Sequence, residues 1–253
     1  MKILGIHYGH DSNVALIENG KIKFTISEER INRKKFYQGF PFLSIKATLD
    51  YSNLNPQDID KVALVNLNAQ QETLGNTIDN FYSRLNADVP WYAYALRTPL
   101  SIFDNLTQLK IRRSIAKKML LNTVDKLGFD NKKVSFVDHH LAHAAGAFFL
   151  SGFKDALVFT SDGKGDLVSH RTYQAQNSTF KQLYESQDFD SIGLFYSCVT
   201  VYLGFQALRH EGKITGLAAY GDIQKSQHIP SPVTLNAEST ALKNVLFSIF
   251  KVL

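Results

Sequence analysis

Two stretches of this chain repeat one pattern of apolar strands around a polar turn, and this repetition limits the folds that the sequence can adopt. The first stretch has an apolar strand over residues 2–8, a turn over residues 9–12 and a second strand over residues 13–18. An Asn-Gly pair then marks a two-residue hairpin into an alternating strand over residues 21–27. The chain therefore opens with a predicted three-stranded antiparallel meander.

The second stretch begins with a strand over residues 156–161, followed by a tight turn over residues 162–166 that contains two glycines. The pattern predicts further strands over residues 167–174 and 179–187, and helices over residues 192–203 and 214–220. Between the two stretches we expect a helix over residues 41–54, strands over residues 61–67 and 133–137, and a mostly helical insertion over residues 71–127.

Two units that open in this way, with Gly and Asp in their turns, suggest a duplicated α/β fold of the actin/sugar-kinase type. In that fold the two turns face each other and bind nucleotide phosphates through backbone N–H groups. A glycine turn alone is equally compatible with a simple hairpin. We expect mixed five-stranded sheets flanked by helices, a complete first domain over residues 1–150, a partial second domain over residues 151–222, and a divergent tail over residues 223–253.

A histidine-rich segment stands at the start of an apolar, Ala-rich helix that is predicted over residues 139–150. His139 and His143 are four residues apart and therefore lie on one face of the helix, a spacing that suits two imidazole ligands of one metal ion. His140 and His143 are an alternative pair, and structural histidines are common. Asp138 precedes the first turn, where a carboxylate can cap the helix.

The composition argues against several classes of protein. With 253 residues and 44% hydrophobic content, the chain can form one large or two small domains. Its single cysteine, Cys198, cannot form an internal disulfide, which favours a reducing compartment. The N-terminal apolar run is too short for a signal peptide, and no window reaches transmembrane length. We therefore expect a cytoplasmic protein without a membrane partner.

The chain carries a formal net charge of +5. A positive field helps to attract anionic substrates such as nucleotides or acyl phosphates. No aromatic-interleaved basic motif accompanies the charge, so nucleic acid is not expected as a partner.

Five ordered motifs, which together cover residues 1 to about 222, resemble the carbamoyltransferase family that includes the nodulation-factor and antibiotic O-carbamoyltransferases. The motifs occupy residues 3–12, 28–35, 138–145, 162–165 and 211–221. The chain is also similar, more distantly, to the universal protein that makes threonylcarbamoyl-adenosine in tRNA.

The resemblance implies an enzyme that converts carbamoyl phosphate and ATP into a carbamoyl adenylate and then moves the carbamoyl group to a hydroxyl of a small molecule. Such a transfer requires a base for the hydroxyl and a cationic or metal stabiliser of the negative oxygen. By position in the family motifs, His10 is the candidate base or positioning group and Lys35 the candidate stabiliser. A turn-capping role for His10 and a solvated cation at Lys35 are the alternative interpretations.

The resemblance also implies a divalent, iron-type metal ion held by His139 and His143, which bridges nucleotide phosphate oxygens. The residues implied to line the nucleotide are Asp11, Ser12, Asp162, Gly163 and Gly165. Glu211 and Lys213 belong to a matched motif without an assigned role, and a salt pair at the start of a helix explains them equally well.

The sequence departs from the family pattern at two places. Phe36 stands where the family usually has a histidine after the lysine. A polar group is thus absent on the acceptor side, and the identity of the acceptor substrate does not follow from the resemblance. After Gly221 the resemblance is expected to stop, whereas family members continue with a third, carboxylate metal ligand, further adenosine contacts and a carbamoyl-phosphate domain. A second chain would then supply the missing half. A truncated, non-catalytic nucleotide- or metal-binding relative is the alternative, and a sugar or acetate kinase is less favoured because its chemistry gives the histidine pair no role.

Overall fold

The structure, a computed structural model, describes residues 1–65, 114–187, 191–207 and 209–226. The chain divides into two compact units, Met1–Asp138 and His139–Leu253, and each is described by itself. Most of the predicted insertion over residues 71–127 and most of the tail lie outside the described residues, although residues 114–126 are helical as predicted. Within the described parts, no helix is both long and apolar enough to cross a bilayer.

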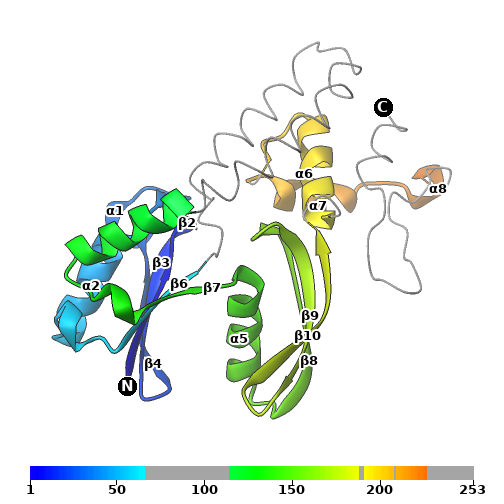
Figure 1. Cartoon of the computed structure of the whole chain (residues 1–253). Coiled ribbons are helices and arrows are strands. Elements are labelled where there is room, and N and C mark those ends of the chain that lie inside the picture. The colour runs from blue at the N-terminus through cyan, green and yellow to red at the C-terminus, as the bar shows by residue number, and fades with distance from the viewer. Residues whose placement is uncertain (66–113, 188–190, 208, 227–253) are drawn as a thin grey trace. The chain divides into compact units, whose positions relative to one another are not determined.

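The first unit is built on a five-stranded mixed sheet in the order β4-β3-β1-β6-β7 (Figure 1). Its strands are β1 (Lys2–His7), β3 (Asn13–Glu18), β4 (Lys21–Ser27), β6 (Lys61–Val65) and β7 (Val134–Val137). β1 runs antiparallel to β3 and parallel to β6, and β6 runs parallel to β7. The predicted opening meander and the mixed five-stranded sheet of this unit are therefore confirmed.

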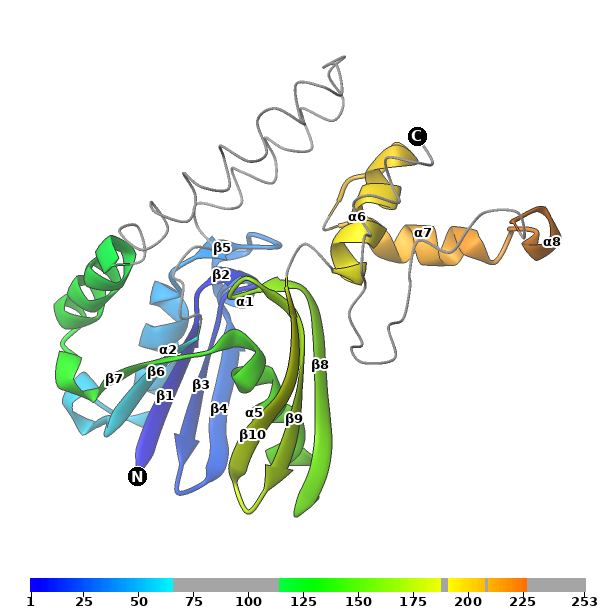
Figure 2. The same ribbon diagram turned by 45° about the vertical axis from the view of Figure 1, so that its right-hand side comes forward.

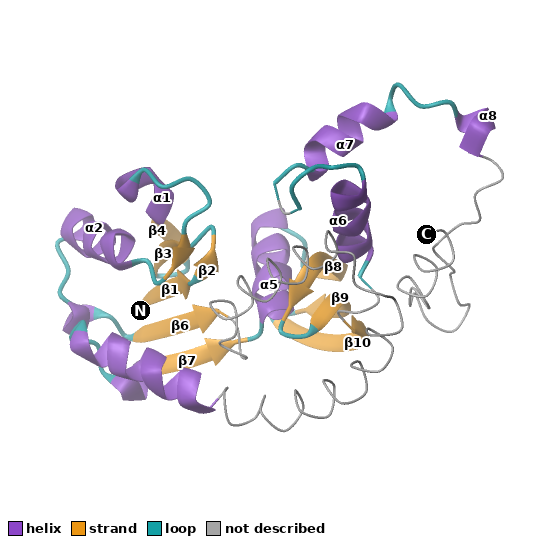
Figure 3. Cartoon of the chain, turned by 90° about the horizontal axis from the view of Figure 1, so that it is seen from above, coloured by secondary structure: helices purple, strands orange, loops and turns teal. Residues whose placement is uncertain are grey.

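One face of this sheet carries the core of the first unit. Alternate residues of β1 point into it, among them Leu4 and Ile6, which are fully buried. Helix α2 (Phe42–Ser52) and the helical segment over residues 114–126 contribute Ile45 and Val124 to the same cluster. Both lie on one side of the sheet in the view from above (Figure 3).

Short elements complete the first unit, and most of them were not predicted from the sequence. They are β2 (Gly9–His10), α1 (Glu28–Asn32), β5 (Gln38–Gly39) and the 3-10 turns Pro56–Asp58 and Asn131–Lys133. β2 pairs with β5, so that His10 lies opposite Gln38. The predicted turn over residues 9–12 therefore contains a short strand.

The second unit pairs a three-stranded antiparallel sheet, in the order β10-β9-β8, with one covering helix (Figure 2). Its elements are α5 (His139–Ser151), β8 (Asp155–Gly165), β9 (Val168–Gln176), β10 (Thr179–Gln187), α6 (Ile192–Tyr202), α7 (Glu211–Ala218) and α8 (Ile223–Ser226). Ala144 and Phe148 of α5 pack on Val158 and Tyr173 of the sheet. The sequence-based division at residue 150 groups α5 with the first domain, whereas in the structure it packs on the strands that follow it.

The turn between β8 and β9 corrects a prediction. The predicted glycine turn over residues 162–166 is wrong, because β8 continues through Gly165 and the chain reverses at Asp166 and Leu167, both with positive φ. Between Ser161 and Gly165 the pairing of β8 with β9 shifts register. This irregularity displaces Asp162 from the regular ladder. Helix α7 likewise begins at Glu211, three residues before its predicted start.

Candidate metal centre

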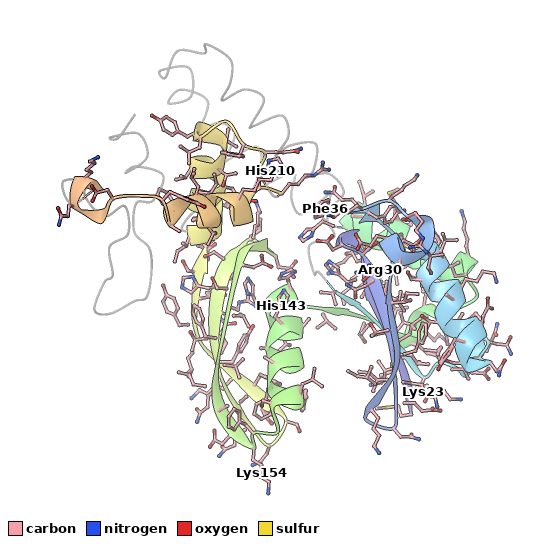
Figure 4. All side chains as sticks on the ribbon, turned by 180° about the vertical axis from the view of Figure 1, so that it is seen from behind. Lys23, Arg30, Phe36, His143, Lys154 and His210 are labelled. Atoms are coloured by element: carbon pink, nitrogen blue, oxygen red, sulfur yellow. The ribbon has the colours of Figure 1, made fainter. Side chains whose placement is uncertain are left out.

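Two histidines project from the first turns of α5, which begins two residues after β7 ends. Their rings lie 4.7 Å apart, and the two Nε2 atoms are 3.1 Å apart. His139 is only 4% exposed, whereas the His143 side chain is 57% exposed. Figure 4 shows His143 near the N-terminal end of α5, beside the sheet. The predicted i, i+4 pairing is thus present, with one ligand atom inside the unit and the other at its surface.

Asp162 joins the histidine pair from the irregular end of β8. Its Oδ2 atom lies 2.7 Å from Nε2 of His139 and 3.5 Å from Nε2 of His143. The three side chains each offer one ligand atom, and these atoms all lie within 4.8 Å of one another. The family resemblance implied that Asp162 contacts the nucleotide and that the carboxylate ligand lies beyond Gly221. In the structure a carboxylate already stands beside the two imidazoles.

The donor set and its spacing fit a divalent metal ion. Two imidazoles and one carboxylate are the ligands that non-haem iron and catalytic zinc sites use. A metal about 2.1 Å from each of two ligands at a right angle separates those ligands by about 3 Å. The Nε2–Nε2 and Nε2–Oδ2 separations of 3.1 and 2.7 Å meet that requirement.

Hydrogen bonds hold the three groups together. Burial opposes ionisation of the Asp162 carboxyl, yet hydrogen bonds from His139 and His143 outweigh it and hold the pKa of Asp162 well below its usual range. The hydrogen bond with Asp162, opposed by partial burial, raises the pKa of His143. A bound cation would replace the shared protons as the partner of this carboxylate.

His140 is held by hydrogen bonds within the fold, which favours His139 and His143 over the alternative pair of His140 and His143. It is fully buried, its Nε2 donates to the carbonyl of Val168 at 3.1 Å, and its Nδ1 lies 3.0 Å from the Thr160 hydroxyl. Both ring nitrogens are therefore engaged by β8 and β9. Among the described residues, the pair with a third donor nearby is His139 and His143.

The residues after Asp162 bring backbone close to the cluster. A β-carbon at Gly165 would overlap the imidazole of His139, so a larger residue here requires a shift of the strand or of the His139 ring. Gly163 lies against Gly193 in the first turn of α6, where a β-carbon on Gly193 would come within 2.9 Å of the Gly163 Cα. The Asp166 carboxylate accepts the backbone N–H of His139, the first residue of α5, at 2.9 Å, and so helps to fix the start of this helix.

His10 and its neighbours form the second predicted part of the site, in the first unit. The Asp11 carboxylate accepts a hydrogen bond from Nδ1 of His10 at 3.0 Å, and the carbonyl of His10 accepts one from Nε2 of His7 at 3.1 Å. Asp11 adopts a positive φ of 54°. Ser12 is buried, with 1% of its surface exposed, and its carbonyl accepts the N–H of Glu28 at 2.9 Å. The turn thus exposes His10 and Asp11 and buries Ser12.

Lys35 lies in the loop between α1 and β5. Its Nζ is 5.1 Å from the centroid of the Phe36 ring, in a cation–π contact. The Phe36 N–H donates to the Glu29 carboxylate at 3.1 Å, which fixes a residue with a φ of 57°. Phe36, labelled in Figure 4 and noted above as a departure from the family pattern, therefore supports the lysine through its ring. The pairing of β2 with β5 brings His10 opposite Gln38, three residues beyond Lys35.

Glu28 connects these two segments, and the sequence analysis gave it no role. This carboxylate is only 2% exposed and accepts the N–H groups of Leu43 and Ser44, in the first turn of α2, at 3.1 and 2.7 Å. A buried carboxylate at a helix N-terminus is a favourable arrangement. A sequence signal existed, because Ser27 followed by two glutamates is typical of a helix start.

Glu211 joins two helices of the second unit. Its Oε1 accepts a hydrogen bond from the Ser197 hydroxyl of α6 at 2.8 Å, and the Tyr196 and Thr215 hydroxyls lie 2.8 Å apart beside it. These contacts dock α7 on α6.

The fold and the cluster together define a mixed α/β protein with a two-histidine, one-carboxylate candidate metal site. The family model described as "Carbamoyltransferase N-terminus" matches residues 2–243, and the chain belongs to this family. The family match continues to residue 243, so the expected end of the resemblance after Gly221 was too early.

Curated relatives are similar over most of this chain. An uncharacterized protein, sll1178, of Synechocystis is 31% identical over 87% of this chain and 35% of its own length. The nodulation protein NolNO of Sinorhizobium fredii is 30% identical over 84% of this chain and 28% of its own length. The chain thus spans about a third of the length of these relatives.

A solved structure of YeaZ from Pseudomonas aeruginosa is 12% identical, with a TM-score of 0.36 over 72% of this chain and 64% of that one. A similarity this weak supports no inference about the fold.

Proposed function

We propose that this chain forms the nucleotide- and metal-binding part of an O-carbamoyltransferase, which moves a carbamoyl group from carbamoyl phosphate, through a carbamoyl adenylate, to a hydroxyl of a small molecule. Membership of the family supports the reaction class. The observation that carries the proposal is the meeting of His139, His143 and Asp162 at one point of the second unit. The parts of the relatives outside the matched region would supply the remaining substrate contacts.

His139, His143 and Asp162 would hold the divalent, iron-type metal ion. When bound, such an ion neutralises charge on phosphate oxygens, which favours departure of a phosphate leaving group. Asp162 then acts as the carboxylate ligand, within the chain itself. Gly165 contributes by leaving room for the His139 ring, and Asp166 contributes by holding the first turn of α5.

In the transfer step, the acceptor hydroxyl oxygen forms a bond to the carbamoyl carbon, the bond from that carbon to the adenylate oxygen breaks, and AMP leaves. The hydroxyl proton must pass to a base, and His10 is the proposed group. Because Asp11 accepts the Nδ1 proton of His10, the tautomer that it favours leaves Nε2 as the nitrogen that can take a proton.

Lys35 is proposed to stabilise the negative oxygen of the tetrahedral centre. The loop that carries Lys35 is tied to α1 by the bond between Glu29 and Phe36 and to the strand of His10 by the β2–β5 pairing. Asp11, Ser12, Gly163 and Gly165 are proposed nucleotide contacts through their backbone amides. The buried hydroxyl of Ser12 supports a backbone role rather than a side-chain role there.

The arrangement of the strands supports a duplicated fold of the actin/sugar-kinase type. β1, β3 and β4 form an antiparallel meander at one side of the first sheet, and β8, β9 and β10 form a meander with the same order. In the first unit the residues proposed to contact the nucleotide follow the first strand of the meander, and in the second unit they form the irregular end of that strand.

The reaction is tested with the native assembly purified from the source cells. Because the acceptor is unknown, the readout is carbamoyl-phosphate-dependent release of pyrophosphate from ATP. We expect the double variant His139→Ala, His143→Ala to abolish this release, and His210→Gln, which changes a histidine outside the cluster, to retain it. Full activity of the double variant would contradict the proposal, and so would a wild-type assembly that binds metal without turnover.

A further inference from the structure

The turn that carries His10 is closed by two side chains from the strands on either side of it. His7 is the last residue of β1 and Asn13 is the first residue of β3, and the two lie opposite each other in the β1–β3 pairing. Leu4 and Ile6 point into the core, so His7 lies on the other face of the sheet, with Asn13 as its cross-strand neighbour. Two partly buried polar side chains therefore flank the turn at the end of this strand pair.

Each of these side chains donates to a carbonyl of the turn. Nε2 of His7 lies 3.1 Å from the carbonyl oxygen of His10, and Nδ2 of Asn13 lies 3.0 Å from the carbonyl oxygen of Asp11. A carbonyl can only accept a hydrogen bond, so Nε2 of His7 must carry a proton. His10 takes the opposite tautomer, because its Nδ1 donates to the Asp11 carboxylate. We call the two bonds from His7 and Asn13 the turn clamp.

The turn clamp also fixes the direction of two backbone N–H groups. In a planar trans peptide, the C=O of one residue and the N–H of the next point in opposite directions. Because the carbonyls of His10 and Asp11 point toward the clamp, the N–H groups of Asp11 and Ser12 point away from it. Asp11 has a left-handed φ of 54°, and successive N–H groups in such a turn can form a concave site for an anion.

Neither of these two N–H groups has an acceptor in the part of the chain that the structure describes. No hydrogen bond leads from the N–H of Asp11 or of Ser12 to any described residue. Ser12 is only 1% exposed, and its buried hydroxyl also has no partner among the same residues. Buried polar groups nearly always have a partner. The unsatisfied groups of the turn therefore indicate that it receives a hydrogen-bond acceptor from another molecule.

We propose that His7 and Asn13 are positioning residues of the nucleotide site. Through the turn clamp they hold the N–H groups of Asp11 and Ser12 in place for one phosphate group of the nucleotide. The same bonds fix the backbone of His10, the proposed base. Without the clamp the two peptide planes can rotate, so the donors are no longer preorganised and the phosphate group binds more weakly. The inference rests on the proposed function, in which this turn contacts the nucleotide.

An NMR titration of the recombinant 253-residue chain with AMP tests this inference. We expect AMP to shift the amide resonances of Asp11 and Ser12 in the wild type. His7→Leu and Asn13→Leu each remove one donor of the clamp, and each should weaken AMP binding about fivefold, the effect of one typical hydrogen bond. His7→Gln should restore most of the affinity, because its side-chain amide can donate to the same carbonyl.

The imidazole nitrogen shifts of the wild type provide a readout that does not depend on the folding of any variant. We expect the proton on Nε2 in His7 and on Nδ1 in His10. A His7 ring with its proton on Nδ1 alone cannot donate to the carbonyl of His10, so this result would overturn the inference.

Gln57→Leu is the matched control, because it removes a side-chain N–H that donates to the carbonyl of Gly128, elsewhere in the unit. It should retain the AMP affinity of the wild type. The same affinity in this control and in both clamp variants would contradict a positioning role. The inference also fails if AMP leaves the Asp11 and Ser12 resonances of the wild type unmoved. Pyrophosphate release from ATP by the native assembly is a separate readout, so either failure is distinguishable from failure of the proposed function.

Discussion

At the scale of single residues, the candidate metal centre depends on glycines that leave space as well as on the side chains that offer ligand atoms. His139 is nearly buried against backbone at Gly165, and the first turn of α6 approaches Gly163 through Gly193. Close packing leaves no room for even one methyl group at these contacts. The three donor atoms are therefore positioned by packing before any ion binds.

Replacing Gly165 with alanine tests this packing. The new β-carbon overlaps the His139 ring, so either the strand or the ring must move, at a cost of about 1–3 kcal/mol in the free energy of unfolding. We expect at least a tenfold loss of Co²⁺ affinity, measured by absorbance titration. Gly146→Ala is the control. Gly146 lies on α5, the helix that carries His139, and a β-carbon there meets no other atom, so this variant should retain affinity. Wild-type affinity in Gly165→Ala would contradict the packing argument.

Cys198 provides a prediction of pH dependence. Burial in α6 raises the pKa of its thiol, because the thiolate loses hydration there. At a given pH the folded protein therefore contains less thiolate than an exposed cysteine does, and alkylation by iodoacetamide should be slow at neutral pH and accelerate only above the usual range of a cysteine. Mass spectrometry of the labelled chain measures the rate. A pH profile identical to that of the chain in guanidinium would show that the thiol is exposed.

At the scale of elements, the buried carboxylate of Glu28 ties together the two helices, α1 and α2, on either side of the loop that carries Lys35. Glu28 binds the first turn of α2, and its own N–H binds the carbonyl of Ser12. These bonds join α1, α2 and the His10 turn within the first unit. The elements that carry the two proposed catalytic side chains thus share one anchor.

Glu28→Ala should loosen that anchor. Two N–H groups of α2 lose their acceptor in a buried place, which should cost about 1–3 kcal/mol of stability. Amide exchange over residues 33–41 and 9–12 should accelerate more than tenfold. Asp58→Ala removes another carboxylate that accepts a backbone N–H, in this case the exposed N–H of Asn55, elsewhere in the unit. It should lower stability without accelerating exchange in those two segments, and the same exchange pattern in both variants would refute the anchor.

The strands of both meanders and the histidine helix could be predicted because their signals are local. The hairpin turn at Asp166 and Leu167 could not, because the glycines that normally mark a turn lie within β8 instead. Gly165 makes room there for the His139 ring, whereas a β-carbon at Gly163 would meet no other atom. The turn therefore uses residues that rarely adopt a positive φ, with values of 52° and 70°. Asp162 was missed as a partner of His139 for a related reason, since no spacing rule connects residues 23 apart.

At the scale of the whole molecule, the two units carry different parts of the proposed chemistry. The first unit holds His10 and Lys35, and the second holds His139, His143 and Asp162. The parts of the longer relatives outside the matched region are additional polypeptide that is proposed to supply the remaining substrate contacts. Metal binding should thus be a property of this chain alone, whereas turnover should require the additional polypeptide.

An anaerobic Fe²⁺ titration of the recombinant chain, read as iron bound per chain after gel filtration, tests the central claim most directly. We predict one ion per chain for the wild type and none for His139→Ala, His143→Ala. Asp162→Asn should bind at least about 100-fold more weakly, because even neighbours of a metal ligand contribute about 10–100-fold. Circular dichroism confirms that each variant is folded. Iron binding by the histidine double variant equal to that of the wild type would contradict the assignment of this cluster as the metal centre.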